Sequence, residues 1–272
     1  MTLLDRYLDA ARATLGEVAA SQGEPLEAAA RLVADSVAAG GVLHVFGAGH
    51  SQLVALDAYL RAGGLACVNP IVDPLLAPAA GHEVSRRERQ QGLAATLLEG
   101  EDLRPGEVVL VVSNSGVNAV PVELAVGCRD RGLTVVALTN VDQAKATPAR
   151  HPSGAKLHEV ADVVVDNRCP AGDAAVPLDG PSDRGTPPGP IDRGTPPGFP
   201  GPLRPGPLRR VGPLTTVVGA AVVAALAARV AELLQQRGAG VPVLVSQNLD
   251  GCAAERNDEL LRAYRGRTRL PW

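Results

Sequence analysis

The sequence predicts an α/β fold in which a parallel sheet carries helices on both faces. Short apolar segments alternate along the chain with longer segments whose apolar residues recur every three or four positions. The short segments are apolar throughout, which is typical of strands buried on both faces. Small polar turns follow two of these strands and precede helices, as they do at the ligand-binding edge of parallel sheets.

Each expected element rests on such a local pattern. Helices are expected at 2–21, 25–39, 51–62, 86–99, 120–131, 215–236 and 253–266. Strands are expected at 42–47, 66–73, 107–116 (with its terminal polar turn), 133–140 and 161–167. His44 lies within an apolar strand, which predicts a core position for it.

Composition limits the class of protein. The chain has 272 residues, 46% of them hydrophobic and only 2% aromatic, so its core must be built from Ala, Val and Leu. A net charge of −3 and few aromatic residues argue against nucleic-acid binding. The four cysteines form no C-x-x-C pair, so neither a disulfide framework nor a zinc site is expected, and no metal or cofactor is assigned.

A Pro/Gly-rich segment divides the pattern. Residues 179–210 contain the repeated sequence DRGTPPG and predict a disordered insertion, or alternatively a polyproline loop that binds a partner. We expect one domain made of 41–178 and 211–266, with 1–40 as helices packed on it.

No membrane association is expected. The most apolar stretch, Leu214 to Ala228, is shorter than the roughly 20 residues that a spanning helix needs. The N-terminal helix carries acidic residues and is not a signal peptide, so we expect a cytoplasmic protein.

The polar turns Gly47-Ala48-Gly49-His50-Ser51 and Ser113-Asn114-Ser115-Gly116 are the strongest functional signal. Small residues expose backbone N–H groups, and Ser hydroxyls add neutral donors, so such turns can hold an anion without a lysine. Neither turn has a Walker or dinucleotide-binding motif. Helix capping by Ser and Asn is the alternative interpretation.

These turns, within HVFGAGHS and VVSNSGVNAVPVE, resemble the SIS (sugar isomerase) domain family. Further matching stretches, which extend the resemblance over most of 25–265 and are closest to a stand-alone bacterial SIS group, are RAGGLACVNPIVDP, SRRERQQG, RHPSGAKLHEVADVVVDN, GPLTTVVGAA and SQNLDG. The Pro-rich segment has no counterpart in the family pattern.

This resemblance implies a three-layer sandwich with a five-stranded parallel sheet and a sugar phosphate ligand. It also implies a homodimer, or a homotetramer, with shared active sites. The phosphate is expected on Ser51, Ser113, Ser115 and Asn118, with Asn114 in the same turn.

Relatives in the family include aldose–ketose isomerases and an etherase acting on N-acetylmuramic acid 6-phosphate. Both reactions begin when a base removes the C2 proton beside the open-chain C1 carbonyl, which requires a carboxylate or imidazole in reach. We expect such chemistry on a hexosamine 6-phosphate, N-acetylated or not, with elimination favoured. Isomerisation, or a sugar-phosphate sensor without catalysis, are the alternatives.

The expected base is Glu88, within Ser85-Arg86-Arg87-Glu88-Arg89, and Glu83 is the fallback. A capping box, Ser85-x-x-Glu88, is the competing explanation. His50 is expected to face the ligand as an acid or oxygen-binding donor.

Further residues are expected around the sugar. Arg86 or Arg89 would stabilise the enolate oxygen, and Asp57, His151 (from a partner subunit) and Thr216 would line the ligand or play only local structural parts. The sequence departs from the etherase at Leu60 and Arg61, where that enzyme has an acidic residue. Ether cleavage is therefore in doubt, although C2 proton abstraction is not.

Overall fold

The computed structural model describes residues 1–178, 210–248 and 253–270, and it is built on a five-stranded parallel sheet in the order β2-β1-β3-β4-β5. The strands are β1 (Leu43–Gly47), β2 (Val68–Ile71), β3 (Val108–Val112), β4 (Thr134–Thr139) and β5 (Val163–Asp166). Every residue of β1, β2 and β3 is buried. The predicted α/β class and parallel sheet are confirmed.

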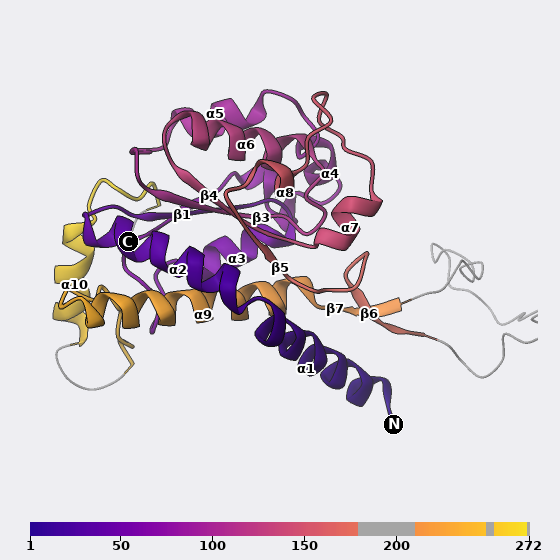
Figure 1. The fold of residues 1–272 in the computed structure, drawn as a ribbon, viewed down its shortest axis with the longest axis horizontal. Helices are drawn as coiled ribbons and strands as arrows, with labels where there is room; N and C mark the ends of the chain where they lie inside the picture. Colours follow the sequence, from indigo (N-terminus) through magenta and orange to yellow (C-terminus); the bar gives the residue numbers. More distant parts are fainter. Residues whose placement is uncertain (179–209, 249–252, 271–272) are drawn as a thin grey trace, which may run out of the picture.

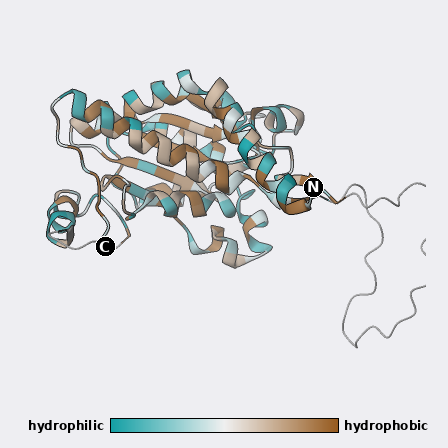
Figure 2. Cartoon of the chain, turned by 90° about the horizontal axis from the view of Figure 1, so that it is seen from below, coloured by the Kyte–Doolittle hydropathy of each residue, from teal (hydrophilic) through white to brown (hydrophobic). Residues whose placement is uncertain are grey.

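Helices cover both faces of the sheet (Figure 1). The helices on one face are α1 (Leu3–Ser21), α2 (Gly23–Ala38), α3 (His50–Ala58) and α9 (Thr215–Gln236), and those on the other are α5 (Leu93–Glu99), α6 (Ala119–Asp130) and α8 (Leu157–Val160). Along the strands, neighbouring side chains enter opposite cores: Val45 packs under the first layer and Phe46 under the second. Figure 2 shows hydrophobic strands between helices that carry both hydrophilic and hydrophobic residues.

Shorter elements lie around the sheet edges. These are the single turns η1 (Pro74–Leu76) and η2 (Pro78–Ala80), the helices α4 (Glu83–Arg87), α7 (Val141–Ala146) and α10 (Ala253–Ala263), and the antiparallel pair β6 (Ala174–Pro177) and β7 (Arg210–Pro213). The β6–β7 pair was not predicted. The expected disordered insertion falls on 179–209, which lie outside the described residues, whereas Arg210 belongs to β7.

The helix predicted over 86–99 is wrong. The structure has α4 ending at Arg87 and α5 beginning at Leu93, because Gly92 adopts a left-handed conformation (φ +79°) that interrupts the helix. The proposed capping box is wrong as well. Helix α4 begins at Glu83, so Ser85 lies inside it and is not an N-cap.

Helix α9 is long and apolar enough to cross a membrane by length and composition. Its contacts give another account of this apolarity, since Val218, Val222 and Leu226 belong to the core shared with α2 and α3.

A buried polar network lies at the amino ends of the strands. His44 is fully buried, as predicted, and its ring contacts the Glu107 carboxylate (3.0 Å) and the Asn69 amide (3.1 Å). Glu107 also accepts hydrogen bonds from the N–H of Val42 (3.0 Å) and from Arg267 (2.5 Å). The network therefore ties β1, β2 and the C-terminal segment to the start of β3.

These donors stabilise the ionised form of the Glu107 carboxyl group. Burial alone would raise the pKa of this carboxyl, but the hydrogen bonds from His44 and Arg267 outweigh it and lower the pKa to about 2. A lowered pKa contributes stability that is present above the ordinary value near 4.5 and is lost as the pH falls towards 2.

We therefore expect Glu107→Gln to lower the free energy of unfolding by about 3 kcal/mol at pH 7, because Arg267 loses the more deeply buried of its two carboxylate partners, Glu107 and Asp102. Urea unfolding at pH 7 and at several values between 5 and 3 measures this, and the variant should lose part of the acid sensitivity. Glu99→Gln, on the exposed end of α5, is the control. Equal stability of the two variants would contradict the assignment.

Candidate functional site

The strand order creates a crevice beside β1. The chain passes from β1 to β2 on one side and then returns to β3 on the other side. Because Gly47 pairs with Val112, the turns that follow β1 and β3 leave the sheet side by side. Ligands of parallel sheets bind at this kind of switch point, at the carboxyl ends of the strands.

A cavity of about 450 Å³ lies at this point. It is lined by the turn after β1 (48–51), the turn after β3 (113–115), five residues of the segment from Pro78 to Glu88, and Gln143, Gly172, Asp173 and Thr215. Its volume is within the range of small-molecule sites. Both predicted anion turns therefore contribute to one cavity.

The turn after β1 has a glycine-dependent path. A Cβ on Gly47 would collide with the backbone oxygen of Ser51, so the chain can turn directly into α3 only with glycine there. His50 is exposed as the first residue of α3. In the part of the chain that the structure describes, the hydroxyl of Ser51 makes no hydrogen bond, so it is available as a donor to a ligand.

The turn after β3 is held by its own hydrogen bonds. Ser113 is buried, and its Oγ accepts the N–H of Gly116 (3.3 Å), which adopts φ +61°. A Cβ on Gly116 would lie 2.7 Å from Thr139 Oγ1, so glycine is required there too. Ser115 is partly buried, and its hydroxyl is unpaired among the described residues.

Asn114 lines the cavity, but its side chain serves as a brace. The amide nitrogen donates to Gln143 on α7 (3.0 Å), and the amide oxygen accepts from Asn167 after β5 (2.9 Å). The side chain of Asn114 thus fixes the turn to two neighbouring segments.

The two candidate bases lie in different environments. Glu88 lines the cavity, where burial raises its pKa above the ordinary value, partly opposed by the Asn118 amide and by the charges of Arg89 and Arg150. Glu83 is absent from the cavity wall, and its ion pair with Arg86 lowers its pKa. Of the two, Glu88 is the better placed to act as a base, because it lines the cavity and its pKa is raised.

Asn118 is not part of the cavity wall. It is buried at the start of α6, where its amide oxygen accepts a hydrogen bond from Arg150 (2.7 Å). Its contact with Glu88 places it behind the carboxylate instead of beside the anion turns.

Several other predicted residues also lie away from this cavity within the chain. Asp57 forms an ion pair with Arg61, Arg86 pairs with Glu83, and His151 contacts Glu123 (3.5 Å). Arg89 is exposed and does not line it. Thr216 lines a narrow extension together with Ser51 and Asn114, while its neighbour Thr215 lines the cavity itself.

Asp173 is a wall residue that the sequence did not indicate. Its Oδ1 accepts the N–H groups of Leu214 (2.8 Å) and Thr215 (2.7 Å), so it caps α9 from a segment distant in the chain. Only the lack of a capping side chain at Leu214 itself could have suggested a remote partner.

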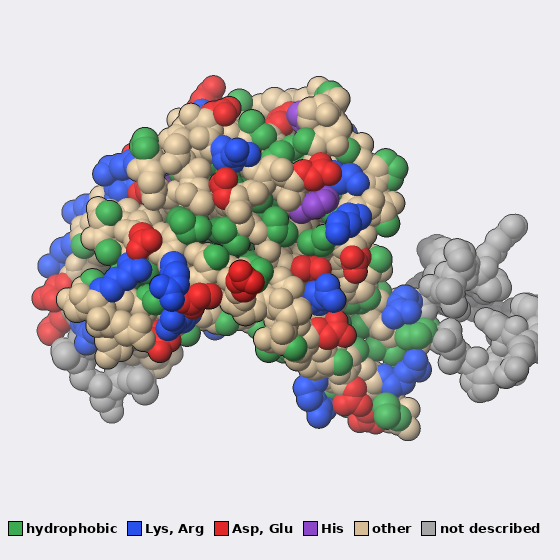
Figure 3. Space-filling model, in the orientation of Figure 1, with side chains coloured by type: hydrophobic (Ala, Val, Ile, Leu, Met, Phe, Trp, Pro, Cys, Tyr) green, Lys and Arg blue, Asp and Glu red, His purple; other side chains and the backbone are tan. Residues whose placement is uncertain are grey.

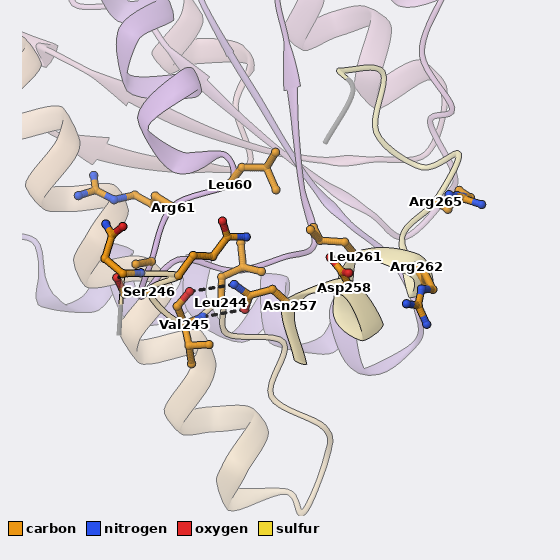
Figure 4. A pocket seen from close by; sticks show the side chains of 13 residues that line it. Leu60, Arg61, Leu244, Val245, Ser246, Asn257, Asp258, Leu261, Arg262 and Arg265 are labelled. Carbon is orange, nitrogen blue, oxygen red and sulfur yellow. Dashed lines mark hydrogen bonds between the residues drawn. The ribbon is translucent and has the colours of Figure 1, made fainter. Parts of the chain in front are cut away.

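A larger cavity of about 630 Å³ lies beyond the C-terminal end of α3, against α10. Figure 4 shows that the side chains of Arg61, Arg262 and Arg265 diverge from one another there instead of meeting at one point. The amide oxygen of Asn257 accepts the N–H of Val245 (2.9 Å), and its amide nitrogen donates to the carbonyl oxygen of Val245 (2.8 Å). The three arginine side chains therefore do not converge on a single ligand position in this cavity.

Charges of both signs are interspersed over the face seen in Figure 3, without a continuous basic patch. Among the described residues, no group of three or more His, Cys, Asp or Glu side chains is arranged to hold a metal ion.

The sequence was compared with protein families and with curated proteins. The family model "SIS domain" matches residues 6–140. A UPF0309 protein of Streptomyces avermitilis is 37% identical over 268 residues, which cover 96% of this chain and 95% of the relative. A UPF0309 protein of Streptomyces coelicolor is 38% identical, with 95% and 94% covered.

A similar fold occurs in the solved structure of phosphoheptose isomerase GmhA from Neisseria gonorrhoeae. The TM-score is 0.53 at 15% sequence identity, covering 84% of this chain and 98% of that one. With the relatives above, these matches show that the chain belongs to the SIS domain family, among the UPF0309 proteins.

Proposed function

We propose that this protein binds a hexosamine 6-phosphate and removes its C2 proton, with elimination of the C3 oxygen as the outcome. One observation carries the proposal. A carboxylate whose pKa is raised by burial, Glu88, shares a cavity with the hydroxyls of Ser51 and Ser115, which have no hydrogen-bond partner among the described residues. An anion site and a base at a fixed separation are what enolisation of a sugar phosphate requires.

The phosphate would occupy the two turns. Ser51 and Ser115 would donate their hydroxyl protons to phosphate oxygens, and Ser113 would do the same while its oxygen continues to accept from Gly116. The structural neighbour described above is a phosphoheptose isomerase, which supports a sugar phosphate as ligand.

The reaction would begin at the open-chain sugar. Glu88 would take the C2 proton, and the electron pair of that bond would form an enolate with the C1 carbonyl. On elimination, the electrons would return to form a C2–C3 double bond as the C3–O bond breaks. His50 would give a proton to the departing oxygen, which leaves as water.

Isomerisation shares the first step and differs in where the proton returns. Elimination is favoured because the chain is similar in architecture to the stand-alone etherase. The non-acidic residues Leu60 and Arg61 speak against a lactyl ether, so dehydration is the proposed form.

We place this activity in a cytoplasmic homodimer with shared sites. Support for a dimer comes from apolar side chains exposed beside the cavity elements: Leu53 and Leu56 on α3 (both 39% exposed) and Val217 on α9 (45%).

Proton NMR in D2O tests the proposal with N-acetylglucosamine 6-phosphate and glucosamine 6-phosphate as substrates. The C2 proton signal should disappear, and vinylic signals should follow. In Glu88→Gln the exchange should slow by at least about 100-fold, because the general base is lost, while binding persists. The rate should fall as Glu88 becomes protonated, at a pH above its ordinary pKa of 4.5.

Glu83→Gln is the matched control and should leave exchange unchanged, since Glu83 lies outside the cavity. Undiminished exchange in Glu88→Gln would remove Glu88 as the base. Binding without exchange in the unmodified protein would identify a sensor instead of an enzyme.

The phosphate assignment has its own test. Replacing both Ser51 and Ser115 with Ala should weaken sugar phosphate binding by about 10- to 100-fold, as expected for lost hydrogen bonds to a charged group. Isothermal titration calorimetry measures the affinity. Ser85→Ala, which removes a hydroxyl from the α4 part of the same cavity wall, should bind normally, and a similar loss in that variant would refute the assignment.

A further inference from the structure

The described residues that line the candidate cavity include carboxylates but no lysine or arginine. Among them, Glu88 and Asp173 supply the carboxylates, and His50 is the only histidine. A phosphate held there would face carboxylates of its own sign in a partly enclosed space, which is unfavourable. The turns supply only neutral donors, so a cationic group on the ligand would compensate the carboxylates on the wall.

Asp173 is held on this wall by two hydrogen bonds from backbone N–H groups. It has φ +73°, and its Oδ1 accepts both Leu214 N–H and Thr215 N–H. The carboxylate thus occupies two of the N–H groups at the N-terminus of α9. Within the described part of the chain, Oδ2 makes no hydrogen bond, which leaves one oxygen available.

We propose that the ligand is an amino sugar phosphate whose amine is free and protonated, and that this ammonium binds Oδ2 of Asp173. This rests on the proposed sugar phosphate site and names its substrate class. An ammonium supplies both a donor and the compensating charge, giving a charge-assisted hydrogen bond. A hydroxyl or an acetamido group would supply only the donor, and would leave the carboxylate charge uncompensated near the phosphate.

Asp173 is therefore a specificity-determining residue. Glu88 cannot take the same part, because in the proposed reaction it becomes neutral on accepting the C2 proton. Asp173 accepts no proton from the substrate in that step and so can hold the ammonium throughout.

The test uses ligands that cannot react. The open-chain alditols 2-amino-2-deoxyglucitol 6-phosphate, its N-acetyl derivative and glucitol 6-phosphate lack the C1 carbonyl, so calorimetry with the full-length protein reports binding alone. The amino compound should bind about tenfold more tightly than the other two.

Asp173→Asn separates charge from structure. An amide oxygen can accept the same two N–H groups, and Asn tolerates positive φ, so the cap on α9 is preserved. This variant should bind the amino compound about tenfold more weakly. It should bind glucitol 6-phosphate more tightly, because the repulsion of its phosphate is removed. A folding defect would instead weaken all three ligands together.

Asp142→Asn removes an equal charge from the exposed surface of α7 and should not change the order of affinities. Equal binding of the three alditols by the unmodified protein would overturn the inference while leaving a sugar phosphate site intact. No binding of any of them would contradict the proposed function itself. If EDTA abolished the binding of all three, a metal ion would be the compensating cation and the inference would fail.

Discussion

The parallel pairing of β1 with β3 is the constraint on which the rest of the site depends. Its register joins Gly47 to Val112, so both strands end at the same level and their turns emerge together. The anion turns are short, and they meet only because the backbone ladder beneath them is fixed. The collision that any Cβ at Gly47 would cause shows how little tolerance the connection into α3 has.

The polar groups at the two ends of the sheet differ in whether the chain itself supplies their partners. At the amino ends, the Glu107 carboxylate is surrounded by the donors of His44, Arg267 and Val42, and all of its charge is compensated within the chain. At the carboxyl ends, the Ser51 and Ser115 hydroxyls and one oxygen of Asp173 are left without partners in the described residues. Stability is thus concentrated at one edge, and unsatisfied polar groups, which a ligand can satisfy, at the other.

Much of the architecture could be predicted because it is encoded locally. Continuous apolar runs identified the five strands, and the turns after β1 and β3 identified two walls of the cavity. The helix over 86–99 failed because Gly92, not the apolar spacing, decides that segment. Asp173 and the β6–β7 pair escaped prediction because they depend on partners distant in sequence, such as Leu214 and Thr215, for which no local pattern exists.

The β6–β7 pair also changes what an insertion costs. Ala174, which follows Asp173, pairs with Pro213, which lies just before α9. The β6–β7 ladder therefore joins the chain on either side of residues 179–209. The entropy of closing that loop is borne by the two-stranded ladder and not by the cavity. A ladder that joins the strands on either side of this segment fixes the positions of Asp173 and of the start of α9 whatever number of residues separates the two strands.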